Sequence, residues 1–195
     1  MVPSTQLPQW GNACTQVLGR TVLRAFGWRL EVRLPDVPKL VVIAAPHTSN
    51  WDFVFALAAI LALRVRVHWF GKHTLFRWPF RRILTALGGI AIDRSAAIGV
   101  VRQTTQQFAA HERLLIGLAP EGTRSLAPHW KSGFYQIALA AGVPIVPAYL
   151  DYRTRTIGLG PTLHPSGDYA ADLETLQSFY RGVTARHPQN FAAEG

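Results

Sequence analysis

The 195-residue chain contains a single cysteine, Cys14. One cysteine excludes an internal disulfide framework and any zinc site that requires several thiolates, and it is compatible with a reducing compartment. Histidines are more numerous, but those other than His47 show no spacing that would place two metal ligands on one face of a helix. The sequence therefore predicts neither structural disulfides nor a metal site.

Long hydrophobic runs are also missing. The longest uninterrupted apolar stretch, 53–63, has 11 residues, whereas a membrane-spanning helix needs about 20. The first 11 residues contain no Lys or Arg and carry two prolines, which is not typical of a secretory signal. We therefore expect no transmembrane span and no signal peptide, and a protein that contacts a membrane peripherally on its cytoplasmic side.

Acidic residues are scarce: 11 Asp and Glu stand against 20 Lys and Arg, which gives a formal net charge of +9. Such an excess is typical of proteins whose partner is a nucleic acid, an anionic membrane surface or a phosphorylated substrate. It also fits a simple compositional bias, because arginine is used far more often than lysine. The chain has no block of five or more like charges and no recognisable nucleic-acid-binding motif, so we expect no nucleic-acid partner.

The chain does contain enough apolar residues for one sizeable core, at 49% hydrophobic and 16% charged over the length of one elaborated domain. Apolar runs rich in β-branched residues alternate with segments of helical periodicity. Strands are predicted at about 40–45, 65–71, 90–92, 114–118, 144–150 and 154–159, and helices at about 15–30, 50–63, 75–87, 96–111, 132–141 and 170–186. This alternation predicts an α/β fold, with a mainly parallel central sheet and helices on both faces.

Two segments combine apolar and basic residues. In 15–30 the apolar residues recur at helical spacing beside a stripe that includes Arg20 and Arg24, which predicts an amphipathic helix that is either packed on the body or set in a membrane interface. We accordingly divide the chain into an N-terminal amphipathic segment, 1–30, for which membrane contact is one of these two alternatives, and a main domain, 31–195. The segment 75–87 mixes Trp and Phe with arginines and fits a packed surface helix and an interfacial membrane element equally.

A histidine, His47, follows the first of these predicted strands directly, and Asp52 stands five positions later, in the first turn of the next helix. The carboxylate can turn back to the imidazole, fix its tautomer and stabilise its charged form, so that the other ring nitrogen can take a proton from an alcohol or water. Reactive groups gather at the carboxyl ends of parallel strands. Taken alone, the pair also fits a capping aspartate beside a packed histidine.

A second loop at a strand end is more specific. The sequence Pro-Glu-Gly-Thr-Arg-Ser at 120–125 places an acid, a hydroxyl and an arginine around a glycine that gives the backbone freedom. Such a loop suits an anionic or polyhydroxylated ligand. It also fits an ordinary tight turn with a Glu–Arg pair.

Together these segments resemble the glycerophospholipid acyltransferase family, the group of 1-acylglycerol-3-phosphate acyltransferases whose first motif is a His and an Asp separated by four residues (HX4D). The matching segments, in chain order, are 47–52, 89–94, 120–125 and 143–147, with 130–133 between the last two. Four ordered matches are far less expected by chance than any one of them. One departure is Pro46, which stands where many members have an asparagine before the motif histidine.

The resemblance implies transfer of a fatty acyl group from a coenzyme A or acyl-carrier-protein thioester to a hydroxyl of a lysophospholipid, most directly 1-acyl-glycerol-3-phosphate, giving phosphatidic acid. His47 would deprotonate the acceptor hydroxyl, which attacks the thioester directly, and Asp52 would orient His47. No covalent enzyme intermediate and no bound cofactor or metal is implied. Backbone amides at 49–52 would suit the developing oxyanion.

The remaining motif residues fall into binding roles. Arg94 and Arg124 would hold the acceptor phosphate, because guanidinium forks bind phosphate oxygens in pairs. Glu121, Gly122 and Thr123 would shape the same pocket, with Glu121 bonding a glycerol hydroxyl or fixing Arg124. Lys131, and with it Lys72, would contact the phosphates of the acyl donor.

Two other interpretations stay open. The first is the same chemistry on another lyso-lipid or lipid hydroxyl. The second, from a different class, is a non-catalytic module that binds anionic lipid or nucleic acid through its basic surface. Loss of His47 separates the classes, because it abolishes general-base catalysis and leaves binding unaffected.

Overall fold

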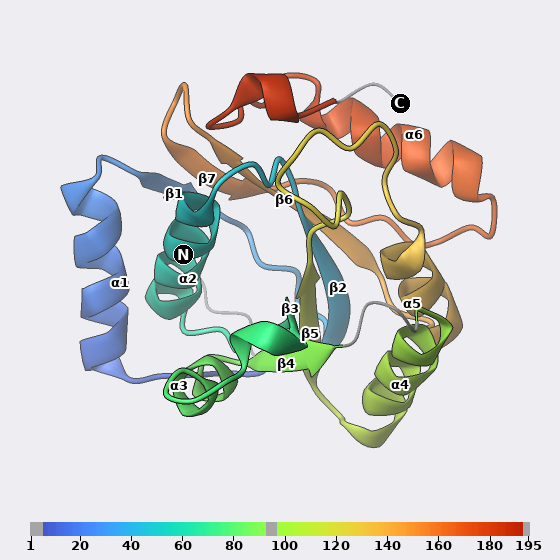
Figure 1. The fold of residues 1–195 in the computed structure, drawn as a ribbon, viewed down its shortest axis with the longest axis horizontal. Helices are drawn as coiled ribbons and strands as arrows, with labels where there is room; N and C mark the ends of the chain where they lie inside the picture. Colours follow the sequence, from blue (N-terminus) through green and yellow to red (C-terminus); the bar gives the residue numbers. More distant parts are fainter. Residues whose placement is uncertain (1–5, 93–96, 193–195) are drawn as a thin grey trace.

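The computed structural model describes residues 6–92 and 97–192, and within them the chain forms a seven-stranded sheet flanked by helices (Figure 1). The strands are β1 (Arg29–Glu31), β2 (Lys39–Ala44), β3 (His68–Lys72), β4 (Gly89–Ile92), β5 (Leu114–Leu118), β6 (Ile145–Asp151) and β7 (Thr156–Leu159). They lie in the order β1-β7-β6-β2-β5-β3-β4, and every neighbouring pair is parallel except β6 and β7. The mainly parallel α/β sheet predicted from the sequence is confirmed.

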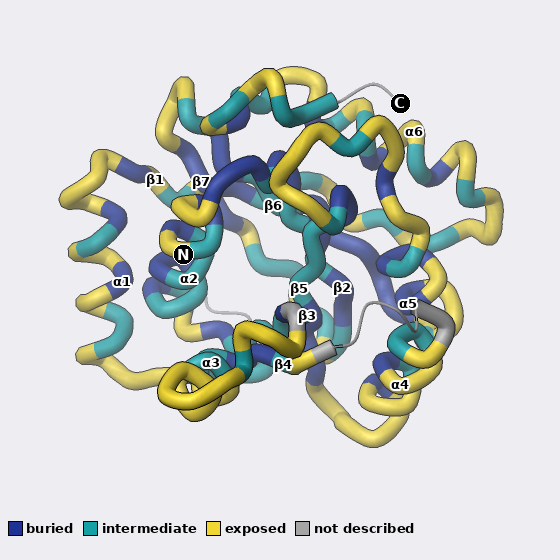
Figure 2. The backbone as a smooth tube through the Cα atoms, in the orientation of Figure 1, coloured by how far each residue is buried: buried dark blue, intermediate teal, exposed yellow. Residues whose placement is uncertain are grey.

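Helices cover both faces of this sheet. They are α1 (Ala13–Ala25), α2 (Asn50–Leu63), α3 (Arg81–Ala86), α4 (Ala97–Ala110), α5 (Gly133–Ala141) and α6 (Tyr169–Tyr180), with the 3-10 helices η1 (His73–Leu75) and η2 (Pro188–Asn190). On one face α1 and α2 bury Leu23 and Phe55 against β6 and β7. On the other face α4, α5 and α6 enclose a larger core that includes Phe108 and Tyr180. The buried central strands lie between these two helical layers (Figure 2).

Most predicted elements are present, but three helix predictions were too long. The helix predicted at 15–30 ends at Ala25, because Gly27 adopts a left-handed backbone with φ of 70° and the chain then enters β1, a strand the sequence did not predict. The segment 75–87 is helical only over α3, after η1. The helix predicted at 170–186 ends at Tyr180, and the chain continues as an irregular segment toward η2.

The N-terminal helix α1 lies directly on α2. A β-carbon at Gly19 would stand 2.4 Å from the carbonyl oxygen of Ala58 and 2.7 Å from the amide of Ala62, so only glycine allows the two helices to approach this closely. Leu23 is buried beside it, whereas Val17 and Leu18 are exposed. The helix is therefore packed on the body, which was one of the two placements that its sequence allowed.

The carboxyl ends of β2, β5, β3 and β6 meet at one edge of the sheet, because these strands are parallel to one another. The loops that leave this edge carry three residues of interest. His47 comes shortly after β2 in the chain, Glu121 shortly after β5, and Tyr152 immediately after β6. None of the helices in the described part of the chain combines the length and the hydropathy that a transmembrane span requires.

Candidate active site

The loop after β2 is built by the start of α2. Ser49 is the N-cap residue, and its side chain accepts a hydrogen bond from the amide of Trp51 at 3.2 Å. The Asp52 carboxylate closes a capping box, because Oδ2 accepts hydrogen bonds from the amides of both Ser49 and Thr48 at 2.7 Å. The amides of Ser49 and Trp51, two of the four in 49–52 that the sequence suggested as oxyanion donors, are thus engaged within the loop.

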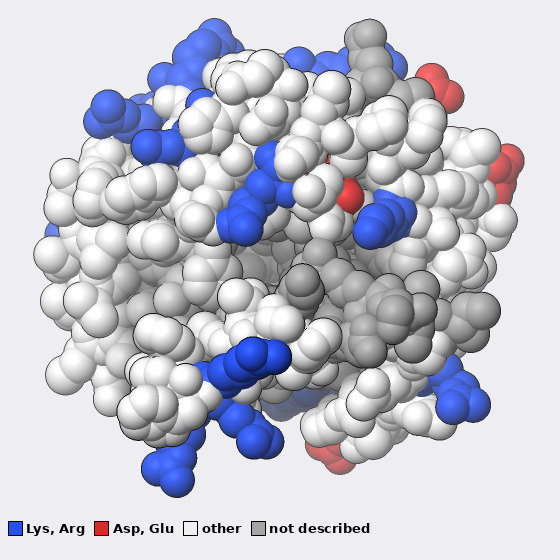
Figure 3. Space-filling model, viewed as in Figure 1, with Lys and Arg blue, Asp and Glu red and all other residues white. Residues whose placement is uncertain are grey.

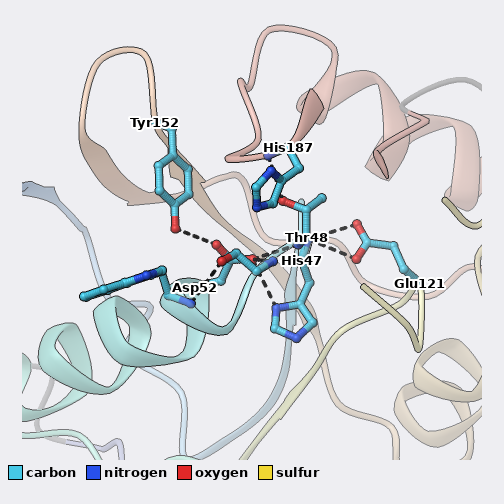
Figure 4. Close-up of polar contacts among 8 residues, drawn as sticks. His47, Thr48, Asp52, Glu121, Tyr152 and His187 are labelled. Atoms are coloured by element: carbon cyan, nitrogen blue, oxygen red, sulfur yellow. Dashed lines mark hydrogen bonds and ion pairs between the residues drawn. The ribbon is translucent and has the colours of Figure 1, made fainter. Parts of the chain in front are cut away.

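The same carboxylate faces the motif histidine. Nδ1 of His47 lies 3.4 Å from Oδ2 of Asp52, slightly longer than an N–H···O hydrogen bond. The Asp52 side chain is 4% exposed and that of His47 is 29% exposed, so the acid is shielded while the imidazole reaches solvent. An aspartate on Nδ1 leaves Nε2 of His47 free to meet a substrate proton. Figure 4 shows the ring directed away from Tyr152 and His187.

Asp52 is held from its other side by Tyr152, which follows β6. The phenolic hydroxyl donates a 2.6 Å hydrogen bond to Oδ1 of Asp52 (Figure 4). Burial alone raises the pKa of Asp52, but the interaction with His47 and the hydrogen bonds from Tyr152 and Ser49 outweigh it, so the pKa lies below its ordinary value of 3.8. The carboxylate is therefore ionised at neutral pH and ready to stabilise a charged imidazolium.

Aromatic rings and one arginine fix Tyr152 in turn. Its ring packs edge-on against Trp28, with centroids 5.0 Å apart. The guanidinium carbon of Arg186 lies 5.8 Å from the centroid of Tyr152 and 5.5 Å from that of Trp51, within the range of a cation–π contact. Burial, followed by the hydrogen bond to Asp52, raises the pKa of Tyr152, so its hydroxyl remains a donor.

The segment after α6 lies across this loop. The amide of His187 donates to Oγ1 of Thr48 at 3.2 Å, and the amide of Tyr152 donates to the carbonyl of Thr184 at 2.9 Å. The segment that contains Thr184 and His187 is therefore hydrogen-bonded both to the motif loop and to Tyr152, although His187 is 139 positions from Thr48 in the chain. Sequence reasoning missed Tyr152, Arg186 and this segment, because no local pattern connects them to His47.

Glu121 lies on the opposite side of His47 from Asp52 (Figure 4). Its two carboxylate oxygens lie 3.1 and 3.0 Å from the amide nitrogen of His47, which donates to them. Burial raises the pKa of Glu121 to about 7, against the opposing effect of the His47 amide. The carboxylate thus fixes the His47 backbone, rather than pairing with Arg124, which is exposed.

The rest of the 120–125 loop presents its polar groups to solvent. Gly122 has a φ of 66°, and a β-carbon there would lie 3.0–3.1 Å from Cδ, Cε and Nζ of Lys131. The Lys131 side chain therefore lies over this turn. The backbone of Lys131 is held there as well, because its amide donates to the carbonyl of Pro120 at 2.9 Å. Thr123, Arg124 and Lys131 are exposed.

The space-filling surface of this face is hollowed at its centre, and Lys and Arg side chains stand above and below the hollow (Figure 3). The positive charge around this hollow suits an anionic substrate. Arg94 lies outside the described residues, as does the side chain of Lys72. Among the described residues, no three His, Cys, Asp or Glu side chains gather as a metal ion would require.

Comparisons with known proteins give one consistent result. The family model described as acyltransferase matches residues 29–151. The 1-acyl-sn-glycerol-3-phosphate acyltransferase of Escherichia coli is 32% identical over 69% of this chain and 57% of its own length, and the enzyme of that name from Haemophilus influenzae is 33% identical over 69% and 58%. The chain thus spans somewhat more than half the length of these relatives.

A solved structure agrees on the fold. The crystal structure of the 1-acyl-sn-glycerophosphate acyltransferase from Thermotoga maritima superimposes with a TM-score of 0.60. The match covers 85% of this chain and 74% of that one, at 18% sequence identity.

Proposed function

The chain belongs to the acyltransferase family, as its ordered motifs predicted, and on that premise we propose that it transfers a fatty acyl group to the free hydroxyl of 1-acyl-glycerol-3-phosphate, giving phosphatidic acid. The observation that carries this proposal is the geometry of His47. Its imidazole reaches solvent at the carboxyl edge of the sheet, while a buried, ionised Asp52 lies 3.4 Å behind Nδ1. This is the arrangement that a general base requires.

The reaction then needs no covalent enzyme intermediate. Nε2 of His47 takes the proton from the acceptor hydroxyl as the hydroxyl oxygen attacks the thioester carbonyl carbon, forming a tetrahedral intermediate. The intermediate collapses by breaking the carbon–sulfur bond, the new ester is released, and the departing thiolate takes the proton back from His47. Asp52 stabilises the imidazolium between these two steps, because its carboxylate stays ionised.

Two groups position this pair without touching the reacting atoms. Tyr152 donates a hydrogen bond to Oδ1, the second carboxylate oxygen of Asp52. Glu121 accepts a hydrogen bond from the amide of His47 and so fixes its backbone from the other side. The single amide of His47 leaves acceptor sites on both oxygens of Glu121, so the glycerol contact expected from the sequence stays part of this proposal. Preorganised groups of this kind hold a base in its productive geometry before substrate arrives.

Cationic side chains would bind the two phosphorylated substrates. Arg124, with Arg94, would hold the acceptor phosphate, and Gly122 and Thr123 would shape the turn beside it. Lys131, which lies over Gly122, would contact the phosphates of the donor. That donor is an acyl-coenzyme A or acyl-carrier-protein thioester, used as a co-substrate, with no resident cofactor.

The proposed acceptor is a lipid, so we expect the protein to work at an anionic membrane surface, to which it attaches peripherally on the cytoplasmic side. We expect no nucleic-acid partner.

The proposal is tested by thiol release from the acyl donor with purified protein in detergent. Lysophosphatidic acid is compared with lyso-lipids that carry other headgroups, each at equal concentration. Release that requires lysophosphatidic acid supports the proposal. Equal release with a neutral headgroup would assign the same chemistry to a different acceptor.

A further inference from the structure

The segment between β3 and the end of α3 exposes an unusual set of apolar side chains. Trp78 is 92% exposed, and Leu75, Phe80 and Ile83 are each more than half exposed. Folded proteins rarely leave large apolar groups clustered at the surface unless a partner covers them. Among the described residues, Trp78 is the most exposed large apolar side chain.

This exposure is built into the local fold. Phe76 points inward: its ring packs against Trp69 with centroids 5.9 Å apart, and β-carbons at Gly71 and Gly89 would stand within 2.8 Å of it. Backbone hydrogen bonds continue the turn, from the amide of Phe76 to His73 and from the amide of Arg81 to Arg77. One anchored aromatic ring therefore holds the neighbouring side chains outward.

Positive charge accompanies the apolar groups. Arg77, Arg81 and Arg82 are exposed within the same segment, and the wider stretch 53–92 holds six Lys or Arg and no Asp or Glu. Trp, Phe and Arg are also enriched in protein–protein interfaces, but the positive charge of this stretch is not balanced by any acidic residue. Aromatic residues interleaved with arginine and charge of one sign together match the uniformly negative surface of an anionic bilayer.

The segment lies at the same edge of the sheet as the candidate base, His47. Residues 73–80 leave the carboxyl end of β3, at the same sheet edge from which His47 and Glu121 leave β2 and β5. In Figure 1 the segment forms the front lower margin of this face, below the central hollow seen in Figure 3. A bilayer that meets the segment would present its lipids to the edge that carries the base.

We propose that residues 75–83 form the membrane-docking surface of this protein, with Trp78, Phe80 and Ile83 inserted among lipid headgroups and Arg77, Arg81 and Arg82 on anionic lipid phosphates. The inference rests on the proposed function only for the lipid nature of the acceptor. It also assigns docking to this segment rather than to α1, the helix whose amphipathic sequence first suggested a membrane contact.

Co-sedimentation of the full chain with vesicles, without acyl donor, tests the proposal. The vesicles contain either phosphatidylcholine alone or phosphatidylcholine with one-third phosphatidylglycerol. The wild type is expected to bind the anionic vesicles more tightly than the neutral ones, and added salt is expected to weaken that binding. Equal binding to both vesicle types, or none to either, would overturn the proposal.

Paired variants locate the surface. Arg77→Gln with Arg82→Gln should lower the partition onto anionic vesicles by roughly 30-fold, about five-fold for each charge. The control pair, Arg102→Gln with Arg181→Gln, removes the same total charge from exposed positions elsewhere, one in α4 and one directly after α6. This control should lower the partition onto anionic vesicles much less. Equal losses in the two pairs would mean that only net charge matters, and would contradict a defined surface.

The apolar half is tested in the same way. Trp78→Ser with Ile83→Ser should abolish most binding, whereas Val17→Ser with Leu18→Ser, on the exposed side of α1, should bind as the wild type does. The reverse result would place docking on α1 and refute the proposal. Sedimentation velocity identifies the other occupant: a wild-type dimer that Trp78→Ser dissociates would assign the surface to a second copy of the chain.

Failure of this proposal can be distinguished from failure of the proposed function. His47→Ala should bind vesicles normally because it carries no part of the surface. Trp78→Ser with Ile83→Ser should retain acyl transfer to acceptor in detergent micelles and lose it for acceptor in vesicles. Loss in both preparations would contradict a role confined to docking.

Discussion

The hydroxyl of Tyr152 donates a 2.6 Å hydrogen bond to Oδ1 of Asp52, although 100 positions separate the two residues in the chain. The bond joins the end of β6 to the first turn of α2, and so to the histidine that α2 follows. It occupies the carboxylate oxygen that the motif loop leaves free, since the amides of Thr48 and Ser49 occupy the other. The acid of the pair is therefore held by the fold as well as by its own motif.

Replacing Tyr152 by Phe removes this hydrogen bond and keeps the ring packing. A hydrogen bond to a charged group contributes about 1.5–3 kcal/mol, so kcat should fall by roughly 10- to 100-fold with little change in either KM. Because the bond also lowers the pKa of Asp52, Asp52 should titrate at higher pH in the variant, which carboxylate NMR can follow. An Asp52 titration identical to that of the wild type would show that Tyr152 acts on packing alone.

Arg124 is expected to act on acceptor binding. The variant Arg124→Gln removes one charge-assisted contact from an exposed position, so KM for lysophosphatidic acid should rise by roughly 5- to 50-fold. The value of kcat should change much less, because the phosphate lies away from the reacting hydroxyl. Arg153→Gln, at another exposed arginine, serves as the charge-matched control. Identical KM values for the two variants would remove Arg124 from the phosphate site.

Glu121 should make stability fall as pH rises. Burial raises its pKa in the folded protein to about 7, whereas the unfolded chain releases this proton near 4.5. The folded state thus binds more protons between these values, and ionisation of Glu121 destabilises it progressively across that range. Asp52, whose pKa lies below 3.8, is already ionised there.

Glu121→Gln keeps an acceptor for the amide of His47 and removes the titration. Urea unfolding at pH 5 and pH 8 should show the variant gaining on the wild type by roughly 2–4 kcal/mol between the two conditions. A constant difference at both pH values would mean that Glu121 does not titrate in this range.

The contact of α1 with α2 allows a test of packing. Gly19→Ala places a β-carbon 2.4 Å from the carbonyl oxygen of Ala58, and backbone atoms there must move, so unfolding free energy should fall by about 1–3 kcal/mol. Gly133→Ala, where a β-carbon would meet no atom within 4 Å, is the matched control and should be neutral or slightly stabilising. Equal melting temperatures for the two variants would contradict the close helix approach.

Much of the site could be predicted from the sequence because its motifs are local. His47 and Asp52 lie within one turn of each other, and the Ser49 cap that sets their geometry is a short-range pattern. The fold class followed in the same way, since hydrophobic periodicity marks strands and helices over a few residues.

The remainder depends on contacts between distant residues. Nothing near Tyr152 or Arg186 in sequence indicates a partner in α2, and the contact of Glu121 with the amide of His47 spans 74 positions. The early end of α1 did carry a local signal, because Gly27 follows the last turn and takes the left-handed backbone typical of helix ends. The three-residue β1 after it is too short to show an alternating pattern.

The proposed reaction depends on His47 acting as the general base of acyl transfer. The most direct measurement is thiol release from the acyl donor in detergent with saturating lysophosphatidic acid, comparing the wild type with His47→Ala and with His164→Ala, an exposed histidine. We expect a loss of roughly 10²- to 10⁴-fold for His47→Ala and wild-type release for His164→Ala. Acceptor-dependent release by His47→Ala at the wild-type rate would contradict a role of His47 as the base.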